Sequence, residues 1–246
     1  MKASEIEFRL RVVIMVIVVI LGFWSPWIEA WGIGHRISML EWLPLELSRL
    51  GAASFATASA AVIVLGSLVA AMGVVLRVWG SAYLGYSTVH HGEMQAGRVM
   101  ADGPYRFVRN PLYLGDWFMI LAMALVMPPT GAVFSMVLLT VFLLRLILGE
   151  EAFLSGQLGE PYKEYLRTTP RLIPRLRGGL PAAGNKPQWM TAVLAELNSI
   201  GVFITLAVLS WSYDHMLMLK GIVISFGVSL VMRALMKRGQ ADPSAA

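Results

Sequence analysis

The chain has 246 residues, of which 57% are hydrophobic and only 14% are charged, and its mean hydropathy is +0.67. Because soluble domains carry about 25% charged residues, this composition predicts an integral membrane protein. The lack of cysteine excludes disulfides and thiolate metal sites. In a membrane protein, a net charge of +5 relates to topology and to anionic lipid, so no nucleic-acid partner is expected.

The N-terminal part, residues 1–79, is expected to hold two membrane helices joined by a surface segment. The apolar run 10–27 has a basic start but lacks a small-residue cleavage site, so it is interpreted as a membrane helix and not as a signal peptide. Residues 28–50 mix charged and large apolar side chains, which is typical of an interfacial segment. The run 53–79 is long enough to cross a hydrocarbon core of about 30 Å.

A short helical hairpin is predicted over residues 112–148. Its arms are 112–127 and 131–148, and the sequence MPPTG between them cannot continue a helix. The predicted catalytic core covers residues 80–177, a linker follows at 178–189, and an appended pair of membrane helices covers 190–236. Residues 237–246 are predicted to be a disordered tail. The expected fold class is therefore an all-α, polytopic membrane helical bundle with about six spans.

The distribution of Lys and Arg predicts the orientation. With the N-terminus in the cytoplasm, sixteen of the 20 basic residues fall on the cytoplasmic side and three on the other. This asymmetry follows the positive-inside rule, so both termini and both long polar stretches should face the cytoplasm. We expect a bacterial inner membrane.

The first polar stretch, GPYRFVRNPLYLGDWF at residues 103–118, leads directly into the hairpin. Pro111 suits the first turn of a helix, and Asn110 suits the N-cap position, where its side chain can satisfy free amides. A helix start also attracts anions such as carboxylates. The alternative is an ordinary capped membrane helix with snorkelling arginines.

The second polar stretch begins with Glu150 and Glu151, directly after the apolar run. Acids at the C-terminal end of a helix oppose its dipole, so they need a cationic partner. Arg109, Arg145 or a positively charged ligand could supply one. The alternative is a helix that continues into water with these acids on its exposed face.

Together these blocks carry a family resemblance. GPYRFVRNPLYLG, a helical hairpin, EE and then LGEPYKEYLRTTPRLIP resemble, over roughly residues 85–176, the superfamily of isoprenylcysteine carboxyl methyltransferases and phospholipid methyltransferases. The superfamily pattern is GPYrxxRHPxYxG, about 35 residues, EE, then fGxxYxxYxxxxPxxiP. Asn110 stands where many members have histidine, and since asparagine cannot titrate, this departure argues against an obligatory histidine base here.

The resemblance implies S-adenosylmethionine as methyl donor and a set of site residues. The implied cofactor contacts are His90, Val99, Met100, Tyr105, Asn110, Pro111, Leu112, Tyr113 and Glu150. The catalytic candidates are Arg109, Arg145 and Glu151, where either arginine could pair with an anionic acceptor; for Arg145, snorkelling to the interface is the alternative. His90, His91 and Glu93 form an incomplete ligand set, so no metal is expected.

The acceptor is expected to be lipophilic and to arrive from the bilayer, for example an isoprenoid or prenylcysteine-like carboxylate or a lipid head group. Two other functions remain open. Membrane sterol reductases resemble this superfamily but bind NADPH, whose 2′-phosphate Arg98 and Arg106 could hold. A non-enzymatic scaffold would bind no cofactor. Homodimerisation through the C-terminal helices is a further option.

Overall fold

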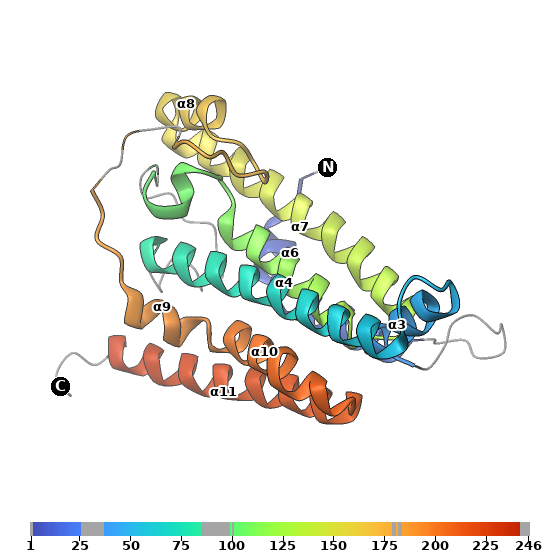
Figure 1. Ribbon diagram of the computed structural model, residues 1–246. Helices are drawn as coiled ribbons and strands as arrows, with labels where there is room; N and C mark the ends of the chain where they lie inside the picture. The colour runs from blue at the N-terminus through green and yellow to red at the C-terminus, as the bar shows by residue number, and fades with distance from the viewer. Residues whose placement is uncertain are drawn as a thin grey trace.

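All regular structure in the described part of the chain is helical, which confirms the all-α part of the expected fold class. The computed structural model describes residues 2–25, 37–84, 99, 101–178, 181 and 184–241. Its elements are α1 (Glu5–Arg9), α2 (Arg11–Phe23), α3 (Met39–Arg49), α4 (Phe55–Leu84), the 3₁₀ turn η2 (Gly103–Arg106), α6 (Pro111–Ala124), α7 (Pro129–Leu158), α8 (Glu160–Thr168), α9 (Trp189–Ala195), α10 (Leu197–Val208), η3 (Leu209–Ser212) and α11 (His215–Ala241) (Figure 1).

Three of these helices are long and apolar enough to cross a membrane, which agrees with an integral membrane protein. They cover Phe55–Leu84, Pro129–Leu158 and His215–Met236. A fourth span results if α9 and the following helix, which meet at a bend of 67°, are counted as one broken span. The expected number of about six is not confirmed, because α2 and α6 have only 13 and 14 residues and reach about 20 Å each.

Two helix boundaries differ from the sequence-based expectation. The second arm of the hairpin, α7, continues to Leu158 and does not end near residue 148. Glu150 and Glu151 therefore lie inside a helix, and the expectation that they oppose a helix end was wrong. Likewise α4 continues to Leu84, beyond the expected end of this run at residue 79.

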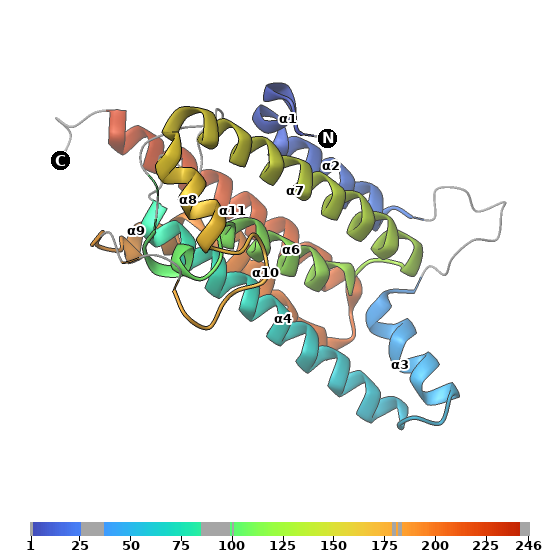
Figure 2. The same ribbon diagram turned by 90° about the horizontal axis from the view of Figure 1, so that it is seen from above.

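The centre of the fold is α6, which lies between two groups of helices (Figures 1 and 2). On one side its Met119 and Ala122 share an apolar cluster with α4 and with Val202 and Leu206 of α10. On the other side its Ile120 joins a cluster from α1, α2 and α7 that includes Leu143. The helix that follows Asn110 is therefore fixed from both sides by burial of apolar area.

Glycines spaced seven residues apart along α4 allow α6 to approach closely. A Cβ on Gly66 would lie 2.3 Å from Leu125 Cδ1, on Gly73 2.8 Å from Met119 Sδ, and on Gly80 2.9 Å from Leu112 Cδ2. The partners run in the opposite order along α6, so the two helices are antiparallel. Small residues at such interfaces are the usual route to tight helix packing in membranes.

The glycine on the α6 side of this interface gives a stability prediction. A Cβ on Gly115 would lie 2.6 Å from Arg77 Cγ and 3.0 Å from the carbonyl oxygen of Gly73, which is backbone and cannot move aside. We expect Gly115→Ala to destabilise the purified protein by about 1–3 kcal/mol through overpacking. Gly156→Ala, in α7 with nothing within 4 Å of the new Cβ, should be neutral or slightly stabilising. Thermal unfolding in detergent compares the two; equal midpoints would contradict the close approach of α4 and α6.

The remaining helices flank this centre. α3 lies beside the hairpin turn, where its Met39 and Leu40 amides donate to the carbonyl oxygens of Met127 and Leu125 (2.9 and 2.8 Å). Of the predicted interfacial segment 28–50, residues 28–36 lie outside the described part. α9, α10 and α11 pack below α4 in the view of Figure 1. The same view places η2, α8 and the start of α9 at one end of the bundle, where the candidate site lies.

Candidate active site

The two polar stretches singled out in the sequence meet in space at the start of the hairpin. Asn110 occupies the N-cap position of α6, as predicted, but its side chain does not cap the helix. Its Nδ2 instead donates to Glu151 Oε1 and to the carbonyl oxygen of Arg171, both at 3.2 Å. One polar side chain thus joins the entrance of α6 to the middle of α7 and to the segment after α8.

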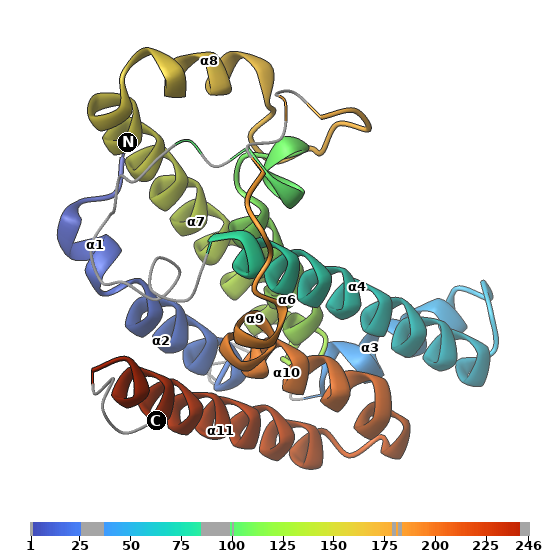
Figure 3. The same cartoon turned by 90° about the vertical axis from the view of Figure 1, so that its left-hand side faces the viewer.

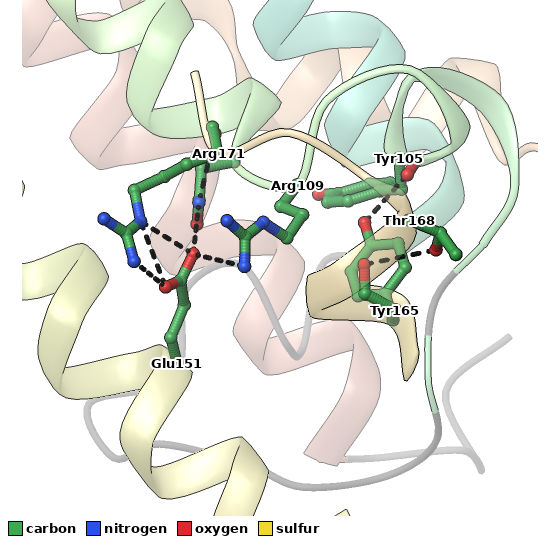
Figure 4. Close-up of polar contacts among 7 residues, drawn as sticks. Tyr105, Arg109, Glu151, Tyr165, Thr168 and Arg171 are labelled. Carbon is green, nitrogen blue, oxygen red and sulfur yellow. Dashed lines mark hydrogen bonds and ion pairs between the residues drawn. The ribbon is translucent and has the colours of Figure 1, made fainter. Parts of the chain in front are cut away.

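Glu151 is the centre of a buried charge cluster (Figure 4). Its carboxylate accepts hydrogen bonds from Arg171 Nε (3.1 Å) and Nη2 (2.8 Å) and forms an ion pair with Arg109 Nη1 at 3.5 Å. The Glu151 side chain is only 7% exposed and that of Arg109 only 10%. Of the cationic partners proposed for the acids from sequence, which were Arg109, Arg145 or a charged ligand, Arg109 is therefore present. The hydrogen bonds to Glu151 raise the pKa of the Arg171 guanidinium.

The neighbouring carboxylate, Glu150, has a different partner. The hydroxyl group of Tyr113, in the first turn of α6, donates to Glu150 Oε2 at 2.8 Å. The two contacts, Asn110 with Glu151 and Tyr113 with Glu150, lie one helical turn apart along α6. Asn110 and Tyr113, at the entrance of α6, therefore each contact one member of the acidic pair.

Tyr105, in η2, contributes a buried phenol to the same end of the bundle. Its carbonyl oxygen accepts from the Tyr165 hydroxyl at 2.7 Å, which fixes the turn against α8. Its own hydroxyl group is buried and has no hydrogen-bond partner among the described residues. Burial raises the pKa of Tyr105 well above its ordinary value, so the phenol is a neutral donor. A buried polar atom of this kind calls for a partner beyond the residues that the structure describes.

The segment after α8 holds the cluster together. The backbone amide of Arg109 donates to the carbonyl oxygen of Pro170 (2.9 Å), and that of Arg175 donates to the carbonyl oxygen of Phe107 (3.0 Å). These bonds place Arg171 opposite Glu151. The block TTPRLIP in the sequence therefore lies along the segment that leads into the hairpin and is hydrogen-bonded to it.

Arg145 lies elsewhere. Its Nη2 donates to both carboxylate oxygens of Glu7 in α1, each at 2.8 Å. The ion pair lowers the pKa of the Glu7 carboxyl. The structure does not bring Arg145 into the contacts of Glu151, and its side chain ties the N-terminal helix to α7.

The other predicted site residues have the following places. Pro111 is the first residue of α6 and is buried, and Leu112 packs against Gly80 of α4. Val99 is half-buried, whereas His90 and Met100 lie outside the described residues. An open hollow of about 370 Å³ lies beside η2, and none of the described residues predicted to contact the cofactor lines it. Its lining residues are Trp79, Tyr83, Asp102, Gly103, Arg106, Phe107, Gly184 and Asn185.

Four charged residues with buried partners were missed by the sequence reasoning. The sequence analysis included Arg171 only within the block after α8 and did not predict that it would pair with an acid. Arg77 and Asp116 lie in the apolar helices α4 and α6, and ionisable residues in such helices are rare and usually functional, which was a usable signal. Glu196 lies between α9 and α10 and carries the same signal.

Residues 61–160 match the family model described as phospholipid methyltransferase. The segment contains α6, all of α7 and the residues Arg109, Asn110, Tyr113, Glu150 and Glu151. The resemblance stated from the sequence motifs is thereby confirmed.

A curated relative supports the same class. Over 70 residues the chain is 41% identical to the methanethiol S-methyltransferase of Crocosphaera subtropica (strain ATCC 51142 / BH68). The aligned part covers 28% of this chain and 27% of that protein. No solved structure matches the chain.

Proposed function

We propose that this protein transfers a methyl group from S-adenosylmethionine to a lipophilic acceptor that arrives from the bilayer. The observation that carries the proposal is the direct contact between the helix entrance and the acidic pair, Asn110 with Glu151 and Tyr113 with Glu150. Both contacts lie inside the segment that matches the methyltransferase family. A packed structural hairpin would not need two adjacent carboxylates at this point, one of them buried and the other half-buried.

The residues present fit the proposed donor. S-adenosylmethionine supplies an activated methyl group on a positively charged sulfur, together with an amino-acid moiety and an adenosine. The Glu150 carboxylate offers negative charge to a cation. The ring of Tyr113, whose hydroxyl group donates to Glu150, offers an aromatic face. The buried hydroxyl group of Tyr105, which has no partner in the described part of the chain, offers a hydrogen bond. His90, Val99, Met100, Pro111 and Leu112 remain part of the proposed contact set.

Little acid–base chemistry is required if the acceptor is already a carboxylate, because the donor carries a good leaving group. The task of the protein is then to align the donor with the acceptor, which can lower the barrier by about 7–11 kcal/mol. Arg109 is proposed to orient an anionic acceptor while Glu151, itself held by Arg171, fixes the Arg109 side chain. Arg145, bound to Glu7, is the weaker of the two arginine candidates.

The name of the curated relative favours a second acceptor, a small thiol. A thiol must lose its proton before or during transfer, which a carboxylate does not require. Incubating the purified protein with isotope-labelled donor and either membrane lipid extract or methanethiol would distinguish the two, since the labelled product is a lipid in one case and a volatile thioether in the other.

Isothermal titration calorimetry on detergent-purified protein tests the proposal. We expect S-adenosylmethionine and its demethylated product to bind, and NADPH not to bind. Binding of NADPH alone would support the reductase alternative, and binding of neither would support the scaffold. The cytoplasmic position of both termini, the bacterial inner membrane and a dimer through the C-terminal helices remain predictions that accompany this proposal.

A further inference from the structure

A second buried charge cluster connects the C-terminal helices to the helix that starts at Asn110. Arg77 of α4 forms ion pairs with Asp116 of α6 and with Glu196, the residue between α9 and α10. Its Nε donates to Glu196 Oε2 at 2.5 Å and its Nη2 donates to Glu196 Oε1 at 3.0 Å. One guanidinium thus joins three parts of the chain.

The cluster is completed by hydroxyl groups from two helices. Ser81 Oγ donates to Glu196 Oε1 at 2.6 Å, and Ser199 Oγ donates to Glu196 Oε2 at 3.3 Å. Glu196 is 1% exposed. Both carboxylate oxygens therefore have more than one donor, which is the condition under which a charge can be buried without being expelled from the interior.

The backbone is shaped to make this cluster possible. The helix axis bends by 67° at Glu196, and the bend lets the carboxylate enter the interface with α4. On the other side, the missing side chain of Gly115 leaves room for the stem of Arg77 to pass α6 and reach Asp116. A membrane helix pair that served only as an anchor would not need a broken helix with a buried acid.

The residues of this cluster lie next to residues of the candidate site along both α4 and α6. Asp116 lies one turn after Tyr113 on α6, and Gly80 lies one turn after Arg77 on α4. A Cβ on Gly80 would lie 3.5 Å from the Tyr105 hydroxyl, the buried donor that no described residue accepts from. The side chains that fix α4 against α6 are thus neighbours of those proposed to contact the donor.

We infer that Glu196 is a positioning residue: through Arg77 it sets the position of the first turns of α6, and with it the donor site. The inference rests on the proposed function for its effect on donor binding, but not for its effect on α6. It gives the C-terminal helices, which lie outside the family match at residues 61–160, a role in the methyltransferase. Figure 3 shows α9 and α10 lying beside α4, with α11 on their far side.

The experiment compares Glu196→Gln with Asp214→Asn, a matched acid-to-amide change at an exposed position beside the same helix pair. Hydrogen exchange measured by mass spectrometry should become at least tenfold faster in residues 111–118 of Glu196→Gln and stay unchanged in Asp214→Asn. Acceleration confined to residues 189–212 would overturn the inference, because Glu196 would then fix only its own helices. This readout does not need a ligand, so it stands even if the wild-type protein binds no donor.

A second variant separates positioning from plain stability. Arg77→Met, Asp116→Leu and Glu196→Met together replace the charges by apolar groups of similar size, a change that often restores stability. We expect this triple variant to unfold at or above the temperature of the wild type and still to bind S-adenosylhomocysteine at least tenfold more weakly. Wild-type affinity in a stable triple variant would overturn the inference, since the cluster would then be needed only to hold the fold. If Glu196→Gln fails to fold, the triple variant decides alone.

Discussion

Replacing Glu151 by glutamine is expected to destabilise the protein by about 3 kcal/mol, toward the lower end of the range for breaking one partner of a buried ion pair. The change leaves the guanidinium of Arg109, whose side chain is only 10% exposed, without its counter-charge. The expected loss of stability lies at the lower end of that range because the Arg171 side chain is partly exposed and can be hydrated by solvent. Thermal unfolding in detergent and urea titration measure the effect.

A surface acid provides the control for this prediction. Glu160 of α8 forms ion pairs with Lys163 and Arg167, and all three side chains are more than half exposed. Because exposed pairs contribute about 0–1 kcal/mol, Glu160→Gln should leave the unfolding midpoint nearly unchanged. If Glu151→Gln behaved like Glu160→Gln, Glu151 would not be the centre of a buried charge cluster.

The second large effect is expected for Glu150→Gln, which should weaken the binding of S-adenosylhomocysteine or S-adenosylmethionine by about tenfold or more. A hydrogen bond to a charged group contributes roughly 1.5–3 kcal/mol, and the amide keeps the shape of the carboxylate but loses its charge. Since the proposed donor carries its positive charge on sulfur, S-adenosylmethionine should lose more affinity than its neutral-sulfur product. Calorimetry with both ligands gives the difference directly.

Tyr113→Phe provides the matching control for Glu150. Removing only the hydroxyl that donates to Glu150 Oε2 frees the carboxylate but keeps its charge. The effects of the two variants should therefore be non-additive, as is usual for residues in contact. Wild-type donor affinity in Glu150→Gln would remove this residue from the donor site, and additive effects would show that Tyr113 acts separately.

The sequence was informative where chemistry and local pattern coincide. The motif before the hairpin predicted the N-cap position of Asn110 and the first-turn position of Pro111, and the structure has both. It also predicted that the EE pair needs a cationic partner, and Arg109 supplies one. These features depend on local backbone preferences or on the rule that buried charges are paired, so they can be recognised without coordinates.

The rest depends on which helices become neighbours, and sequence patterns do not specify this. Arg77 and Glu196 are 119 residues apart, and the bend that joins them lies inside an apolar stretch without proline or a glycine pair. The boundary of α7 was misjudged for a related reason. Hydropathy falls at Glu150, but the helix continues because Tyr113, Asn110 and Arg171 satisfy the acids from other elements.

The length of α6 has a consequence for how an acceptor would reach the site. A helix of 14 residues spans about 21 Å, so it leaves roughly a third of a 30 Å hydrocarbon layer uncovered at one or both ends. With Asn110 and Tyr113 at one of these ends, an amphiphile dissolved in the leaflet could present its head group without lifting its tail out of the lipid. Its supply would then depend on mole fraction in the bilayer and on lateral diffusion, and only weakly on its concentration in water.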